Sequence, residues 1–90
     1  MAQKSIPGYM RVLAERVHLL RRRQRLSQAE VAKRAEMSPT TLSNIEQAKA
    51  PTITVEHLMA LAHVLRASPN CLLGQEPLEE ATHPEREQAA

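Results

Sequence analysis

Four small, uncharged residues share one face of a short stretch near the middle of the chain: Pro39, Thr40, Ser43 and Asn44. Their spacing places them on one side if the stretch is helical. Exposed helix faces usually carry Lys and Glu, whereas this face offers hydroxyl and amide groups. Such groups hydrogen-bond to the edges of base pairs, and Asn pairs with adenine through one donor and one acceptor. The stretch therefore predicts a surface that reads bases in double-stranded DNA, with a plain helical hairpin as the alternative.

Residue types that carry other chemistry are scarce or scattered. The chain has no aspartate, which excludes a Ser-His-Asp set, and its histidines lie too far apart or on different helical faces to bind a metal. The single Cys71 cannot form an internal disulfide. We therefore expect no enzyme activity, no cofactor and no metal. No secretory signal and no apolar run of about 18 residues is present, so we expect a cytoplasmic protein with no membrane contact.

Composition points to helices and to a polyanionic partner. Tyr9 is the only aromatic residue, so the core must be aliphatic, and single-stranded nucleic acid would find no rings on which to stack. Residues 1–74 carry eleven Lys and Arg against five Glu, a net +6, whereas residues 75–90 carry one Arg against five Glu, a net −4. A basic body with an acidic tail fits a polyanion-binding protein, with a solvated surface as the alternative.

Apolar spacing and cap residues predict an all-α fold, a five-helix bundle. The expected helices cover residues 9–24, 28–35, 39–47, 55–65 and 69–73. Ser27 with Glu30 forms a capping box, and Ser38 and Ser68 each precede a proline, a favoured helix start. The expected inward residues are Met10, Leu13, Val17, Leu20, Val31, Ala32, Ala35, Met37, Leu42, Ile45, Val55, Leu58, Leu61, Ala62 and Leu65. The predicted domain covers 9–74, between a flexible arm (1–8) and a disordered acidic tail (75–90).

Residues 28–47 meet the geometric requirement of a helix-turn-helix, two short helices joined by a tight turn. The runs Leu26–Ala32, Met37–Glu46 and Leu58–Ala62 resemble the Cro/phage-repressor (Xre-type) helix-turn-helix family. The resemblance covers residues 13–74. It implies a lambda-repressor-like fold and a DNA-binding regulator of transcription, with helix 39–47 in the major groove.

The same resemblance implies roles for residues at matching positions. Thr40, Ser43 and Asn44 lie where the family reads bases, and Pro39 begins the same helix. Gln28 corresponds to a glutamine that grips a phosphate at the start of the first helix of the pair. The candidate phosphate contacts are Arg23, Arg25, Gln28, Thr41, Gln47 and Lys49. The two arginines belong to a basic run, residues 21–25, which either flanks the DNA backbone or is a solvated helix end.

The chain departs from the family pattern at four positions. Glu36, Ala48 and Arg66 stand where relatives often have glycine, the residue that adopts left-handed backbone angles without strain. Either these residues are strained or the turns differ. Pro39 stands where several repressors use glutamine to bond a base. Proline cannot do so, which leaves only packing against a thymine methyl.

The expected function is a sequence-specific regulator, a repressor, that binds a palindromic operator as a homodimer. Its interface is expected at Val64, Pro69, Cys71 and Leu72. The alternatives are an antitoxin that autoregulates its operon, a restriction-modification controller, and an adaptor that has lost DNA binding. Whether the chain also binds a protein partner, a toxin or a polymerase, is left open by the sequence. In the adaptor case a recognition face rich in Glu would be expected, and this face has none.

Overall fold

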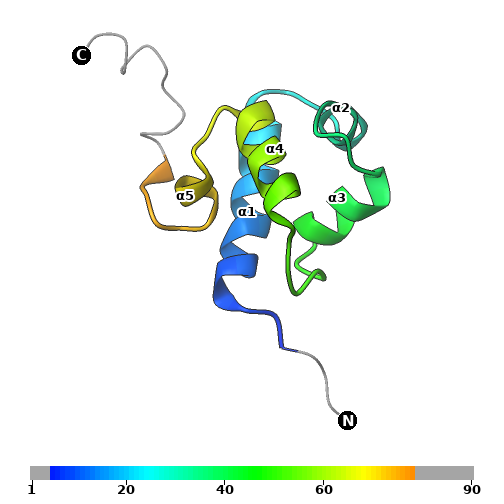
Figure 1. The fold of residues 1–90 in the computed structure, drawn as a ribbon. Coiled ribbons are helices and arrows are strands. Elements are labelled where there is room, and N and C mark those ends of the chain that lie inside the picture. Colours follow the sequence, from blue (N-terminus) through cyan, green and yellow to red (C-terminus); the bar gives the residue numbers. More distant parts are fainter. Residues whose placement is uncertain (1–4, 79–90) are drawn as a thin grey trace, which may run out of the picture.

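Five helices and no strand make up the part of the chain that the structure describes, residues 5–78 of a computed structural model (Figure 1). They are α1 (Gly8–Arg23), α2 (Gln28–Arg34), α3 (Pro39–Glu46), α4 (Val55–Leu65) and α5 (Pro69–Leu72). Every boundary lies within one residue of its predicted position. The all-α prediction is confirmed, and no helix within 5–78 is long and apolar enough to cross a membrane.

Side-chain caps begin four of the five helices. At the start of α2 the Ser27 hydroxyl accepts a bond from the Glu30 amide (3.0 Å), and the Glu30 carboxylate accepts one from the Ser27 amide (2.8 Å), which completes the predicted capping box. Ser38, Thr54 and Ser68 each accept a bond from the third amide of the helix that follows. These bonds satisfy amides that have no partner inside the helix, so local sequence sets where the helices start.

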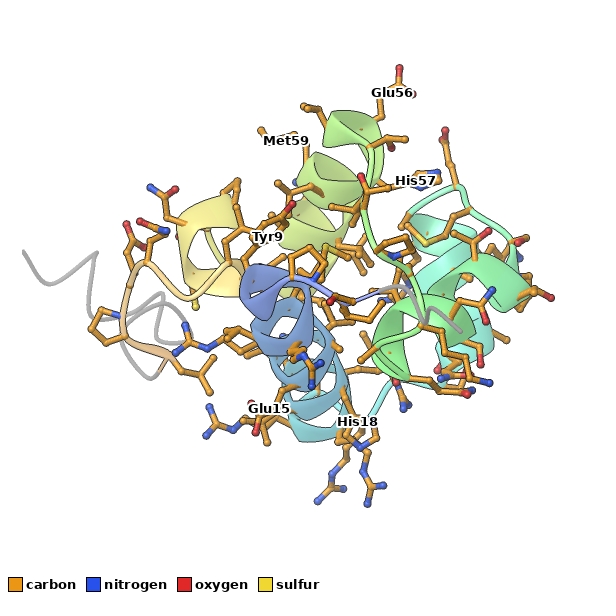
Figure 2. The ribbon with its side chains drawn as sticks, turned by 90° about the horizontal axis from the view of Figure 1, so that it is seen from below. Tyr9, Glu15, His18, Glu56, His57 and Met59 are labelled. Carbon is orange, nitrogen blue, oxygen red and sulfur yellow. The ribbon has the colours of Figure 1, made fainter. Side chains whose placement is uncertain are left out.

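The core is a single aliphatic cluster around α1, which packs against α3, α4 and α5. Its buried members are Met10, Leu13, Val17, Leu20, Val31, Ala32, Ala35, Leu42, Ile45, Leu61, Ala62, Leu65 and Leu72. Met37 and Leu58 are half-buried against it. The inward prediction for Val55 is wrong, because its side chain is 73% exposed. Val55 is the first residue of α4, and the end of the helix that it begins projects beyond the core, as the neighbouring Glu56 shows in Figure 2.

Left-handed backbone angles occur at all three positions where the resemblance leads us to expect glycine. The φ angles are 59° at Glu36, 58° at Ala48 and 59° at Arg66. Arg25, where the sequence analysis expected no left-handed angle, has a φ of 59° as well. The turns are therefore kept and the residues accept the strain, which costs roughly 1–2 kcal/mol per residue with a β-carbon.

The ordered body continues past Gly74, the predicted end of the domain. The Gln75 amide bonds to the Asn70 carbonyl (2.7 Å), and the Ser68 hydroxyl donates to the Glu76 carboxylate (2.6 Å). Leu78 packs against the core. Residues 75–78, here called the C-terminal strap, are therefore part of the fold, and the prediction of disorder is wrong for them. Residues 79–90 of the predicted tail and 1–4 of the predicted arm lie outside the described residues.

Candidate nucleic-acid interface

The helix-turn-helix consists of α2, the turn at residues 35–38, and α3, which lie on the opposite side of the molecule from α5 (Figure 1). Val31, Ala32 and Ala35 of the first half and Leu42 and Ile45 of the second are buried. This contact fixes the angle between the helices. Because the apolar inner face of α3 is packed into the core, the outer face of the same helix is held in a fixed orientation toward solvent.

The predicted reading residues lie together on that outer face. Pro39, Thr40 and Asn44 are exposed and Ser43 is half-buried. The Ser43 hydroxyl accepts a bond from Gln47 Nε2 (2.7 Å). Within residues 5–78 the side chains of Thr40 and Asn44 make no hydrogen bond, so their donors and acceptors face solvent unused.

A shallow hollow of about 260 Å³ separates the middle of α3 from the start of α4. Polar groups from three segments meet in it, which sequence reasoning did not anticipate. Its lining consists of Thr41, Asn44, Ile45, Ala50, Thr52, Ile53, Thr54 and His57. The predicted phosphate contact Thr41 also bonds through its hydroxyl to that of Ser38 (2.9 Å). The hollow therefore extends the polar surface of α3 toward the loop before α4.

Glu46, the last residue of α3, is bound by side chains of two other helices. Its side chain is only 3% exposed. Arg21 of α1 approaches it with two nitrogens, Nε at 2.8 Å and Nη2 at 3.0 Å, while Arg21 Nη1 bonds to the Leu26 carbonyl (2.9 Å). A bidentate pair of this kind is strong and directional. It ties the C-terminal end of the recognition helix to the C-terminal end of α1.

Two further donors complete this cluster, which we call the Glu46 cluster: His18, Arg21, Gln28 and Glu46. His18 Nδ1 lies 3.1 Å from Glu46 Oε1, and Gln28 Nε2 lies 3.1 Å from the same oxygen. Burial acts to raise the pKa of Glu46, but the bonds from Arg21, His18 and Gln28 outweigh it and hold the pKa below its usual 4.5. Glu46 is therefore ionised at neutral pH.

The cluster contains two polar residues that sequence reasoning missed. Glu46 has no surface role, because its carboxylate is an interior acceptor. Its position four residues after the buried Leu42 could have indicated this. His18 is not simply solvated, because one of its ring nitrogens is engaged. Gln28, the predicted phosphate contact, bonds to Glu46 through one N–H of its amide. A carboxamide nitrogen has two hydrogens, so the second can still serve a phosphate.

The other candidate phosphate contacts differ in how freely they face solvent. Arg23, Arg25, Gln47 and Lys49 are all exposed. Gln47 is engaged with Ser43, as described above. Arg21, from the same basic run, is turned inward. Within the basic run of residues 21–25, Arg21 therefore has an interior role, whereas Arg23 and Arg25 lie at the surface.

The residues predicted for a dimer interface are divided in the same way. Cys71 and Leu72 are 0% exposed within a single chain, so their side chains are part of the core and not of an interface. Val64 and Pro69 are half-buried and reach the surface. The burial of Cys71 has a physical reason: the C-terminal strap folds back over α5, and Cys71 Sγ lies 3.9 Å from the Pro77 carbonyl oxygen.

Cys71 also has a cationic neighbour that the sequence did not reveal. Arg16 Nη1 lies 3.9 Å from the sulfur and 2.6 Å from the Cys71 carbonyl oxygen. Burial nevertheless dominates and raises the pKa of the thiol despite the Arg16 charge. The thiol is therefore inert and protonated at neutral pH. Within residues 5–78 no group of His, Cys or Glu could hold a metal ion.

Comparison with known proteins agrees with this geometry. The family model of the helix-turn-helix domain matches residues 12–72. The restriction-modification controller protein C.AhdI from Aeromonas hydrophila superposes with a TM-score of 0.67 at 20% identity, over 73% of this chain and 98% of that chain. The clp gene regulator ClgR from C. glutamicum superposes with a TM-score of 0.67 at 25% identity, over 77% of this chain and 88% of that chain. A chain of the SinR protein/SinI protein complex superposes with a TM-score of 0.66 at 25% identity, over 86% of this chain and 73% of that chain. No curated protein sequence matches the chain.

The fold and the exposed face of α3 define a helix-turn-helix regulator of transcription that binds DNA. More particularly, the chain belongs to the family of helix-turn-helix domains whose model covers residues 12–72, and the resemblance to Xre-type regulators is confirmed.

Proposed function

We propose that this protein is a sequence-specific repressor that binds a palindromic operator as a homodimer, with α3 of each protomer in the major groove. The observation that carries the proposal is the outer face of α3. It presents Thr40 and Asn44 with unused hydrogen-bonding groups on a helix whose inner face is locked into the core. A rigid helix with small polar side chains can approach base edges closely.

The proposed roles divide along this surface. Thr40, Ser43 and Asn44 bond to base edges, and Pro39 packs against a thymine methyl. Arg23, Arg25, Gln28, Thr41, Gln47 and Lys49 contact phosphates, which position the protein without reading sequence. Ser43 and Gln47 each use one hydrogen-bonding group on the other and keep their remaining groups for DNA, whereas Asn44 has all of its groups available. We therefore expect Asn44 to contribute most to base selection.

A dimer is proposed because one recognition helix reads only a few base pairs. Two-fold symmetry would place half-sites about 10 base pairs apart, centre to centre. With Cys71 and Leu72 in the core, the proposed contact uses Val64 and Pro69, which reach the surface on the α4–α5 side. A second candidate function is control of a restriction-modification system or regulation through a partner protein. It is favoured by the similarity to the restriction-modification controller protein C.AhdI and to a chain of the SinR protein/SinI protein complex.

Selection of bound sequences from a random duplex pool tests the proposal. The expected result is an enriched motif with two inverted halves, and sedimentation of the protein at tens of micromolar should give twice the chain mass. Enrichment of no motif would contradict sequence-specific binding. A single unrepeated half-motif together with a monomeric mass would contradict the dimer and leave base reading intact.

A further inference from the structure

We propose that a cationic hollow between α2 and α4 holds the acidic segment 79–90 of the same chain. The hollow has a volume of about 650 Å³ and lies at the C-terminal ends of the two helices. Its lining consists of Arg34, His63, Val64 and Arg66. The inference goes beyond the proposed function, because it concerns a surface other than the outer face of α3 and does not require DNA.

The two arginines of the cationic hollow have no acidic partner among the described residues. Every ion pair within residues 5–78 involves Glu46, and neither of these guanidinium groups takes part in one. Glu30, one turn before Arg34 on α2, accepts a bond from the Ser27 amide in the capping box. None of the four lining residues is acidic. An anion that enters the hollow therefore meets two cationic side chains and no carboxylate in the lining.

The position of the arginines at helix ends accounts for only part of their charge. Arg34 is the last residue of α2, and Arg66 follows the last residue of α4. The C-terminal end of a helix carries a partial negative charge of about half an elementary charge. The two helix ends together therefore offset about one of the two positive charges, and about one is left to attract a ligand.

The backbone on both sides of the hollow is fixed. α2 packs against α4 within the common aliphatic core. Two backbone bonds close the end of α4, one from the Arg66 amide to the His63 carbonyl (3.3 Å) and one from the Ala67 amide to the Ala62 carbonyl (3.0 Å). The lining residues are therefore held at the two sides of the hollow by the fold itself.

The described part of the chain ends close to this hollow. α4 lies between α2 and α5 and packs against both (Figure 1). Ser68, two residues after Arg66, donates to the Glu76 carboxylate (2.6 Å), and Leu78 follows two residues later. The lengths of these short chain segments and of the side-chain bridge therefore place Leu78 within about 25 Å of Arg66.

The residues that follow Leu78 have the length and the charge to occupy the hollow. Residues 79–90 lie outside the described residues, but their charge and their length follow from the sequence. Four glutamates stand against one arginine, a net charge of −3. These 12 residues span up to about 40 Å when extended, which exceeds the distance to Arg66.

Attachment to the same chain favours this occupant over a separate acidic protein. A segment on a short flexible linker is present at an effective concentration in the millimolar range. Each exposed ion pair contributes little by itself, so the tether compensates for the weakness of single bonds. The docked segment would connect the α5 side of the molecule to α2, the first helix of the helix-turn-helix.

Neutralising the acidic segment in the full chain tests the inference. One variant combines Glu79→Gln, Glu80→Gln, Glu85→Gln and Glu87→Gln, and it keeps Glu76, which bonds to Ser68. Two-dimensional amide NMR spectra of this variant and of the wild type would be compared at low salt. The largest differences in chemical shift should fall on the lining residues of the hollow. At about 1 M salt, which screens charges beyond about 3 Å, these differences should disappear.

Substitutions in the hollow separate docking there from a general effect of charge. In a chain with Arg34→Gln and Arg66→Gln, neutralising the segment should leave the amide signals of the hollow unchanged. In the matched control with Arg11→Gln and Arg22→Gln, the wild-type response should persist. All four arginines are exposed, so we expect each variant to fold, and well-dispersed amide signals verify this.

Three results would overturn the inference. Equal spectra of the wild type and the neutralised variant at low salt would show that the segment is not docked. Differences concentrated at residues 21–25 and at Lys49 would show that it covers the candidate phosphate contacts instead. Differences at the hollow that vanish on dilution would show that a second copy supplies the segment. None of these results bears on base reading by α3, so the proposed function stands or fails separately.

Discussion

Two arginines of α1 are half-buried and hold opposite sides of the molecule, yet they do so with different partners. Arg21 meets an ionised carboxylate, Glu46, at the end of the recognition helix. Arg16 donates to two backbone carbonyl oxygens, that of Cys71 at 2.6 Å and that of Glu76 at 2.7 Å, and holds the C-terminal strap. One helix therefore anchors the DNA side through charge pairing and the strap side through neutral acceptors.

The difference has consequences for stability and for function. A buried carboxylate depends on its donors and on its ionisation, so the DNA side should respond strongly to substitution and to acid. Backbone carbonyls do not titrate, so the two bonds from Arg16 on the strap side should be lost when Arg16 is replaced but should not depend on pH. The recognition helix is thus held by its apolar inner face and by a network that also reaches Gln28 and His18, whereas the strap lies on the opposite face.

The largest effect is expected from Glu46→Gln. It leaves the nearly buried Arg21, whose side chain is 12% exposed, without a counter-charge. Removing one partner of a buried pair typically costs about 3 kcal/mol or more. Urea unfolding at neutral pH should show this loss in the free energy of unfolding. Glu15→Gln, at an exposed position of α1, is the control and should change little. Equal effects of the two substitutions would contradict the anchoring role.

The pH dependence of stability, compared between the wild type and Glu46→Gln, sharpens the comparison. Because the pKa of Glu46 is lowered in the folded state, its contribution is fully present above 4.5 and is lost as pH falls through the lower folded value. The wild type should therefore lose stability in this acidic range more steeply than Glu46→Gln does. Parallel curves for the two proteins would show that Glu46 is not the titrating group.

A smaller effect is expected from Arg16→Met. Methionine preserves the apolar stem but removes both bonds to carbonyl oxygens, and charge-assisted bonds of this kind contribute about 2 kcal/mol. The free energy of unfolding should fall by this amount, whereas affinity for DNA should stay the same because the strap lies away from α3. Arg11→Met, at an exposed position, serves as the control. A loss of DNA affinity on Arg16→Met would link the two sides that we regard as separate.

The smallest effects are expected where turns end the helices on each side. Ala48, after α3, has a φ of 58°, so Ala48→Gly should relieve strain and raise stability by up to about 1 kcal/mol. Gly74, after α5, has a φ of 87°, and an added Cβ would lie 3.0 Å from Val12 Cγ1. Gly74→Ala should therefore lower stability. Urea midpoints with opposite shifts would support the turn geometry, and shifts of the same sign would count against it.

Local signals explain why most of the fold could be predicted. Ser27, Ser38, Thr54 and Ser68 cap helices through bonds that span three residues, and the aliphatic residues of α1 recur at helical spacing. The Glu46 cluster could not be predicted in this way. Arg21 and Glu46 are 25 residues apart, and their pairing depends on how α1 and α3 pack.

The strap was missed for a related reason. Its polar and acidic composition predicts disorder, but Leu78 packs against the core, and Arg16 and Ser68 both bond to Glu76. Its closure also explains why Cys71 is buried and not at an interface. In the Glu46 cluster and in the strap alike, a residue distant in sequence determines whether a side chain is buried or exposed. The neighbouring residues in the sequence do not indicate this.

The central claim, that the exposed face of α3 reads bases while residues beside it grip the backbone, is tested most directly by comparing Asn44→Ala with Lys49→Ala. Affinity for the selected duplex and for a scrambled one would be measured at two salt concentrations. Asn44→Ala should reduce the preference for the selected duplex by about 1–3 kcal/mol and leave the salt slope unchanged. Lys49→Ala should weaken both duplexes alike and flatten the slope by about one unit per half-site. If Asn44→Ala weakened both duplexes equally, Asn44 would be a backbone contact and the claim would be contradicted.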